Sequence, residues 1–118
     1  MAKILIVDDD ANIRWGIGKF LEAFGHQIET AINGIDALSQ LKKAPYDIVL
    51  SDKSMPEMNG VTLLKRVQRD YPETRTILMS GGGFAEKDPG DLRVHKPFDF
   101  KTMLSIISAL CAKKRQPA

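Results

Sequence analysis

The feature that most constrains the fold is a series of short, uninterrupted apolar runs separated by segments with helical periodicity. Continuous runs of this length are typical of strands that are buried on both faces, as in parallel sheets. The pattern therefore predicts a parallel sheet that is covered on both sides. Its clearest strands are expected at residues 4–7, 48–50 and 76–79, with weaker candidates at 27–32 and 92–95.

Apolar residues at helical spacing fill most of the gaps between these runs. Asp10 can cap the start of a first helix and Gly25 can end it. A second helix is expected around 37–41, broken before Pro45, and a third around 63–71, stopped before Pro72. A last helix is expected over 100–111, capped by Asp99. This alternation of strands and helices indicates an α/β sandwich with right-handed crossovers.

One connection between strands lacks any helical pattern. Residues 80–91 read SGGGFAEKDPGD, with four glycines, one proline and no apolar periodicity. The sequence therefore predicts a very short helix or none, and a dozen residues is about enough for a parallel crossover without one. A flexible connector is the favoured interpretation, since long loops inside compact domains are usually functional or mobile. The alternative is a phosphate cradle made by backbone N–H groups of the SGGG stretch.

Composition sets the class of protein. The 118 residues fit one domain, 1–118, whose tail from about residue 113 is expected to be frayed. The net charge of +2 gives no global reason to bind nucleic acid, and no apolar run approaches the roughly 20 residues of a membrane span. The single cysteine, Cys111, and an apolar start too short for a signal peptide favour a cytoplasmic protein.

Chemically active side chains follow the strongest predicted strands. Asp8 and Asp9 come directly after the first strand, Asp52 after the third, Ser80 after the fourth and Lys96 after the fifth. The carboxyl ends of parallel strands meet at one edge of the sheet, which is where open α/β sheets bind ligands. Three carboxylates, one hydroxyl and one ammonium are therefore expected to share a single cleft.

The charges of that cleft restrict what it can do. Three neighbouring carboxylates raise one another's pKa unless cations compensate them, and Lys96 offsets only one charge. Mg²⁺ suits the remainder, since it is held by one or two carboxylates together with phosphate oxygen and water. A cation, an ammonium and a hydroxyl are also what a transferring phosphoryl group needs, and a carboxylate can act as its acceptor.

Four segments together resemble the receiver domain of two-component response regulators: VDDD at 7–10, SDKSMPEMNG at 51–60, Ser80 after an apolar strand, and HKPF at 95–98. The resemblance covers nearly the whole chain. It implies a flavodoxin-like three-layer sandwich with a five-stranded parallel sheet in the order 2-1-3-4-5. In this chain the fourth helix of that fold is expected to be shortened or missing.

The resemblance also assigns roles at the magnesium site. Asp52 is the expected phosphoacceptor, receiving its phosphoryl group from a sensor histidine kinase or a histidine phosphotransfer protein. Asp9 and Asp52 are the expected direct Mg²⁺ ligands, together with the backbone carbonyl of Ser54. Asp8 is expected to act through metal-bound water.

Two further residues are expected to meet the phosphoryl group. Ser80 would bind one of its oxygens and Lys96 would pair with its charge, with the Lys96–Pro97 bond in the cis form. Such a protein promotes its own phosphorylation and dephosphorylation, turns over no other substrate, and signals through a downstream protein that the sequence does not name.

Three features depart from the family pattern or stand outside it. Arg93 occupies the position, three residues before the lysine, where receivers usually carry Tyr or Phe. With the missing helix, this leads to the hypothesis that phosphorylation acts by ordering the 81–91 loop. Trp15 falls off the apolar stripe of the first helix, and we expect it to contact a partner near the acidic pair.

Two other functions stay open at this point. The atypical features also fit a receiver-like interaction module that does not use phosphorylation. Asp8-x-Asp10 also resembles the start of haloacid-dehalogenase-type phosphatases, in which the first aspartate is the nucleophile. Those enzymes need another acidic pair after a late strand, where this chain has SGGG.

Overall fold

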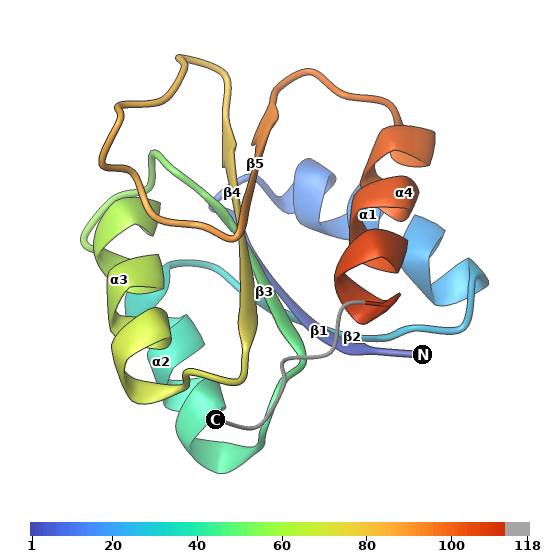
Figure 1. Cartoon of the computed structure of the whole chain (residues 1–118), viewed down its shortest axis with the longest axis horizontal. Coiled ribbons are helices and arrows are strands. Elements are labelled where there is room, and N and C mark those ends of the chain that lie inside the picture. The colour runs from blue at the N-terminus through green and yellow to red at the C-terminus, as the bar shows by residue number, and fades with distance from the viewer. Residues whose placement is uncertain (113–118) are drawn as a thin grey trace.

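The computed structural model of the chain describes residues 1–112, and the expected fraying from about residue 113 lies outside them. Within that range the chain alternates strands and helices, with one interruption (Figure 1). The order is β1 (Lys3–Val7), α1 (Ala11–Ala23), β2 (Gln27–Ala31), α2 (Gly34–Lys43), β3 (Ile48–Asp52), α3 (Gly60–Asp70), β4 (Arg75–Ser80), β5 (Leu92–His95) and α4 (Phe100–Ala112).

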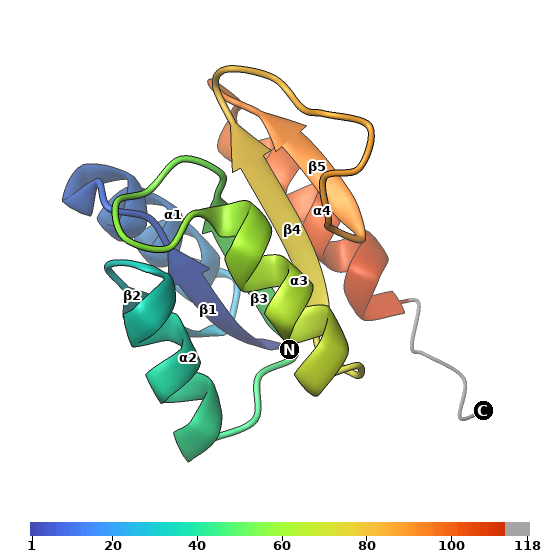
Figure 2. The same ribbon diagram turned by 90° about the vertical axis from the view of Figure 1, so that its left-hand side faces the viewer.

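The five strands form one parallel sheet in the order β2-β1-β3-β4-β5. Figure 1 shows α2 and α3 on one face of this sheet and α1 and α4 on the other, and Figure 2 looks onto the face that carries α2 and α3. The predicted flavodoxin-like three-layer sandwich and its strand order are therefore confirmed.

Burial on both faces explains the uninterrupted apolar runs. In β1, Ile4 and Ile6 belong to the core beneath α1 and α4, whereas Leu5 and Val7 belong to the core beneath α2 and α3. Successive side chains of a strand point to opposite faces, so a strand covered on both sides needs an apolar residue at every position. Each such side chain, fully buried, contributes about 1.5–3 kcal/mol relative to exposure.

The helix ends follow local capping chemistry. Asp10 caps α1 by accepting hydrogen bonds from the N–H groups of Asn12 and Ile13, and Gly25 beyond its end has a φ of +91°. The Asp99 carboxylate accepts from the Thr102 N–H at 2.7 Å at the start of α4, as predicted. Asparagines, which the sequence analysis did not assign, cap the other two helices: Asn33 for α2 and Asn59 for α3.

The connection between β4 and β5 contains no helix, as predicted. Within residues 1–112 every other pair of consecutive strands is joined through a helix. Figure 1 shows residues 81–91 as a loop at the top of the sheet, on the side of α3. Phe84 packs against the core beneath α2 and α3 and gives this loop an apolar anchor.

None of the described helices combines the length and the apolar character that crossing a bilayer requires.

Close packing between the end of β3 and the start of α3 gives a first prediction. A Cβ on Gly60 would lie 2.0 Å from the Asp52 carbonyl oxygen, so we expect Gly60→Ala to lower the free energy of unfolding by about 2–3 kcal/mol. A Cβ on Gly82 would have no heavy atom within 4 Å, and Gly82→Ala should change it by less than about 0.5 kcal/mol. Urea denaturation measures both, and equal midpoints would contradict the prediction.

Candidate functional site

Four strand ends bring the predicted site residues to one edge of the sheet. Asp52 and Ser80 are the last residues of β3 and β4, whereas Asp8 and Lys96 directly follow β1 and β5. The parallel register places Val7 beside Ser51, Asp52 beside Met79, and Ser80 beside His95. The strands therefore end at nearly the same level, and the side chains that follow them share one region.

Asp8, Asp9 and Asp52 form an acidic cluster at this edge. Each residue offers one carboxylate oxygen, and the three oxygens all lie within 4.8 Å of one another. Asp8 is 1% exposed and Asp52 is 9% exposed, whereas Asp9 is open to solvent. Two of the three carboxylates are thus removed from water and depend on neighbouring charges for stabilisation.

Lys96 supplies the positive charge in contact with this cluster. Its Nζ lies 2.9 Å from Asp8 Oδ2 and 3.1 Å from Asp52 Oδ1. Its backbone N–H donates to the carbonyl of Ser80 at 2.9 Å, and the Lys96–Pro97 peptide bond is cis, as the resemblance implies. One ammonium therefore bridges the two buried carboxylates.

The pKa values of Asp52 and Lys96 reflect this balance of charge. Burial raises the pKa of the Asp52 carboxyl; Lys96 opposes this rise, and the charges of Asp8 and Asp9 add to it. Burial on its own lowers the pKa of Lys96, but hydrogen bonds and charges from Asp8 and Asp52 outweigh it, so the pKa lies above its usual value. Without a further cation the site holds more negative charge than one ammonium stabilises.

Asp8 is the most completely bonded carboxylate of the cluster. Its Oδ2 contacts Lys96, and its Oδ1 accepts a hydrogen bond from the Asp10 N–H at 2.9 Å. Its backbone carbonyl accepts from Arg14 Nη1 at 2.5 Å. The sequence analysis missed Arg14, although its place four residues after the helix cap, one turn into α1, could have indicated a side chain near the acidic pair.

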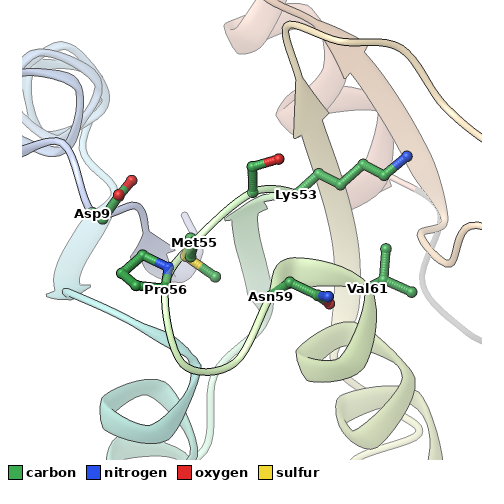
Figure 3. A pocket seen from close by; sticks show the side chains of 7 residues that line it. Asp9, Lys53, Met55, Pro56, Asn59 and Val61 are labelled. Carbon is green, nitrogen blue, oxygen red and sulfur yellow. The ribbon is translucent and has the colours of Figure 1, made fainter.

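A pocket opens beside the acidic cluster, between it and the start of α3. In Figure 3, Asp9 stands on one side of the loop that follows β3, while the side chain of Lys53 extends away from Asp9. The Lys53 N–H donates to Met79 at 2.7 Å, and the Lys53 carbonyl accepts from Gly60 at 2.9 Å, so the loop is fixed. The lining residues are Asp9, Lys53, Ser54, Met55, Pro56, Asn59 and Val61.

Ser80 and the 81–91 loop continue the same edge. The Ser80 hydroxyl is buried and accepts a hydrogen bond from the Gly82 N–H at 3.1 Å. Arg93 is exposed, and its guanidinium donates to the backbone carbonyls of Glu86 and Asp88 in the loop. It also lies 5.9 Å from the centre of the Phe84 ring. The residue at the atypical position therefore holds the loop from the side of β5.

Trp15 lies on α1, a short distance along the chain from the acidic pair. Its side chain is 67% exposed, as expected for a residue off the apolar stripe of that helix. The structure thus leaves the indole available at the surface, and its contact with a partner stays a prediction.

The donor set of the acidic cluster fits a magnesium ion. Carboxylate oxygens are hard ligands, and Mg²⁺ is commonly held by one or two of them while it keeps several waters. Asp9 is open to solvent within a cluster that has excess negative charge, so a hydrated divalent cation would find both ligands and compensation there.

A parallel sheet in this order, with an acidic cluster and a lysine at its carboxyl edge, defines a class of small α/β signalling domains that accept phosphoryl groups. The chain matches the model of the response regulator receiver domain over residues 4–108. It therefore belongs to the response regulator receiver family. Receiver domains are in general phosphoacceptors rather than enzymes; they bind Mg²⁺ at an acidic pocket and interact with sensor histidine kinases and downstream effectors.

Individual relatives agree with this assignment. The chain is 31% identical to the sensor kinase CckA of Brucella abortus over 96% of its own length, and 31% identical to the CpxR homolog of Haemophilus influenzae over 100%. It spans only 13% and 54% of those two proteins. Among solved structures, TrrA of Thermotoga maritima is 30% identical with a TM-score of 0.86, covering 93% of this chain and 99% of TrrA.

The uncompensated charge of the cluster gives a second prediction. Because the pKa of Asp52 is raised, its charged form is less stable in the folded than in the unfolded chain. In metal-free buffer at pH 7, Asp52→Asn should therefore increase the free energy of unfolding, and by more than replacement of a surface carboxylate changes it. As the pH falls through the raised pKa, the wild type binds a proton at Asp52 and the difference should shrink.

Urea denaturation at several pH values, with a chelator present, measures this difference. Glu73→Gln removes an exposed carboxylate away from the cluster and should change the free energy of unfolding by less than about 0.5 kcal/mol. Added Mg²⁺ should stabilise the wild type more than Asp52→Asn. A metal-free Asp52→Asn protein that is less stable than the wild type at pH 7 would refute the charge argument.

Proposed function

We propose that the chain accepts a phosphoryl group on Asp52 from the phosphohistidine of a sensor histidine kinase or a histidine phosphotransfer protein, in a Mg²⁺-dependent reaction. The modified domain then signals by changed binding to a protein target. The observation that carries this proposal is the convergence of Asp8, Asp9 and Asp52 within 4.8 Å, with the Lys96 ammonium on two of the three carboxylates.

The transfer needs a nucleophile and a compensating cation. A carboxylate oxygen of Asp52 forms the new bond to phosphorus while the phosphorus–nitrogen bond of the phosphohistidine breaks, and its electron pair stays on the imidazole nitrogen. Lys96 Nζ, 3.1 Å from Asp52 Oδ1, is placed to neutralise negative charge on the transferring group. Ser80, at the end of the adjacent strand, would donate its hydroxyl hydrogen to a phosphoryl oxygen.

The proposed magnesium ligands are Asp9, Asp52 and the backbone carbonyl of Ser54. The bound ion would supply positive charge opposite the phosphoryl oxygens. Asp8 has both carboxylate oxygens engaged, one by Lys96 and one by the Asp10 N–H, which supports its expected role through metal-bound water. In the solved relative TrrA, Mg²⁺ and a beryllium fluoride group are bound together.

The domain would change its own phosphorylation state and turn over no other substrate. The aspartate-phosphatase alternative requires Asp8 to act as the nucleophile. Asp8 is 1% exposed against 9% for Asp52, and both of its carboxylate oxygens are engaged, one by Lys96 and one by the Asp10 N–H, which leaves Asp52 better placed to meet a donor.

A receiver-like interaction module that ignores phosphorylation is the second candidate. It is favoured by the connection without a helix between β4 and β5 and by Arg93 in place of an aromatic residue. In the phosphorylation proposal the same two features have another meaning. Phosphorylation would order the 81–91 loop, and a partner would recognise the ordered loop.

A phosphorylation assay gives the third prediction. Wild-type protein incubated with acetyl phosphate and Mg²⁺ should gain the mass of one phosphoryl group, measured by intact mass, and a chelator should prevent the gain. Asp52→Asn should not be labelled, because the nucleophile is gone, whereas Asp8→Asn should still be labelled.

The remaining outcomes distinguish the alternatives. No mass gain in the wild type would favour the interaction module. Labelling that depends on Asp8 and survives in Asp52→Asn would instead favour the phosphatase-type chemistry.

The exposed indole gives a fourth prediction. With a phosphohistidine donor protein that labels the wild type, Trp15→Ala should slow phosphotransfer by roughly tenfold, as expected for loss of an aromatic anchor. Labelling by acetyl phosphate should not change, because the Trp15 indole makes no hydrogen bond to the carboxylates of the acidic cluster. Ile35→Ala removes a similarly exposed apolar side chain from α2 and is the matched control. Equal transfer rates for Trp15→Ala and wild type would rule out this contact.

A further inference from the structure

An ion pair links the residue next to the phosphoacceptor with the 81–91 loop. Lys53 Nζ lies 2.7 Å from Asp88 Oδ2 and donates to the carbonyl oxygen of Gly83 at 3.3 Å. The side chain of Lys53 is 26% exposed and that of Asp88 is 8% exposed. Two contacts from one ammonium, to Asp88 and to Gly83, therefore tie the Lys53 side chain to the loop.

Asp88 organises the loop around the same carboxylate oxygen. Its Oδ2 also accepts from the Ala85 N–H at 2.7 Å, and its own N–H donates to the Ala85 carbonyl at 3.1 Å. Arg93 binds the Asp88 and Glu86 carbonyls from β5. The loop is thus held at two points: by Arg93 on the side of β5 and by Lys53 on the side of the phosphorylation site.

Lys53 is positioned by the site itself. In the sequence Lys53 lies between Asp52 and Ser54, the two residues at and just after the end of β3 that are proposed to hold Mg²⁺. The N–H and the carbonyl of Lys53 are both hydrogen-bonded. Its side chain extends away from Asp9 toward the 81–91 loop (Figure 3). Whatever fixes the segment 52–54 therefore also fixes the base of this side chain.

We propose that Lys53 is the positioning residue that couples Asp52 to the 81–91 loop through its ion pair with Asp88. This inference rests on the proposed function and identifies the contact by which phosphorylation orders the loop. The backbone of Lys53 is already hydrogen-bonded on both sides, and ligation of Asp52 and Ser54 would restrict the segment 52–54 further, so less conformational entropy is lost when Lys53 binds Asp88.

The alternative direction is that the phosphoryl group attracts Lys53 away from Asp88 and loosens the loop. Transfer adds one negative charge at Asp52, but Lys96 already contacts that carboxylate and the magnesium ion would compensate two further charges. The added attraction on Lys53 is therefore small against a contact of 2.7 Å with Asp88. The two directions predict opposite changes in the exchange of the loop amides.

Hydrogen exchange of the amides in 81–91 tests the coupling, with and without Mg²⁺ and beryllium fluoride as a phosphoryl mimic. In the wild type the mimic should slow exchange in the loop by about fivefold. Asp88→Asn and Lys53→Met should lose this slowing, because each removes one charge of the pair. Lys53→Arg keeps the charge and should retain the slowing. Lys87→Met removes an exposed lysine of the same loop and is the matched control.

Labelling of each variant with acetyl phosphate, measured by intact mass, separates failure of the coupling from failure of the proposed function. Asp88→Asn should be labelled as fully as the wild type. If the wild type is labelled but the mimic slows exchange in Asp88→Asn and Lys53→Met as much as in the wild type, or if the mimic speeds exchange in the wild type, the coupling is refuted. A wild type that is not labelled would refute the proposed function and this inference with it.

Discussion

The structure depends on how one ammonium compensates an excess of negative charge at the carboxyl edge of the sheet. Lys96 contacts Asp8 and Asp52, and its partner Asp8 lies 88 residues earlier in the chain. Removing the Lys96 charge would leave the buried carboxylates of Asp8 and Asp52 without compensation, which is strongly unfavourable. The same contact therefore holds the two ends of the fold together and keeps Asp52 ready for chemistry. The negative charge that Lys96 does not compensate favours the binding of a divalent cation at the site.

The second constraint is the connection without a helix between β4 and β5. A helix there would bury an apolar face against the sheet; this chain instead packs Phe84 against the core, buries Pro89, and also holds the loop by polar contacts from Lys53 and Arg93. Polar contacts of this kind form and break at lower free energy than a packed helix face. The residue that interrupts the family pattern, Arg93, is thereby part of what replaces the helix.

Much of the fold could be predicted because its signals are local. Strands covered on both sides require continuous apolar runs, and Asp10 and Asp99 cap their helices through side chains that reach only two or three residues along the chain. The acidic cluster could also be predicted, since parallel strands bring their carboxyl ends to one edge. The Lys53–Asp88 pair could not, because no periodic pattern in the sequence marks the partner of a basic residue that looks exposed.

The sequence by itself determined the parallel sheet, the absence of a helix after Ser80 and the set of side chains at the carboxyl edge. These follow from backbone geometry and from the alternation of apolar and polar residues. Only the tertiary structure decided that Lys96 bridges Asp8 and Asp52 rather than Asp9, and that Lys53 turns toward Asp88. Such choices depend on distances of a few Å and on which groups lose water, and these are fixed only when the strands, helices and loops have packed together.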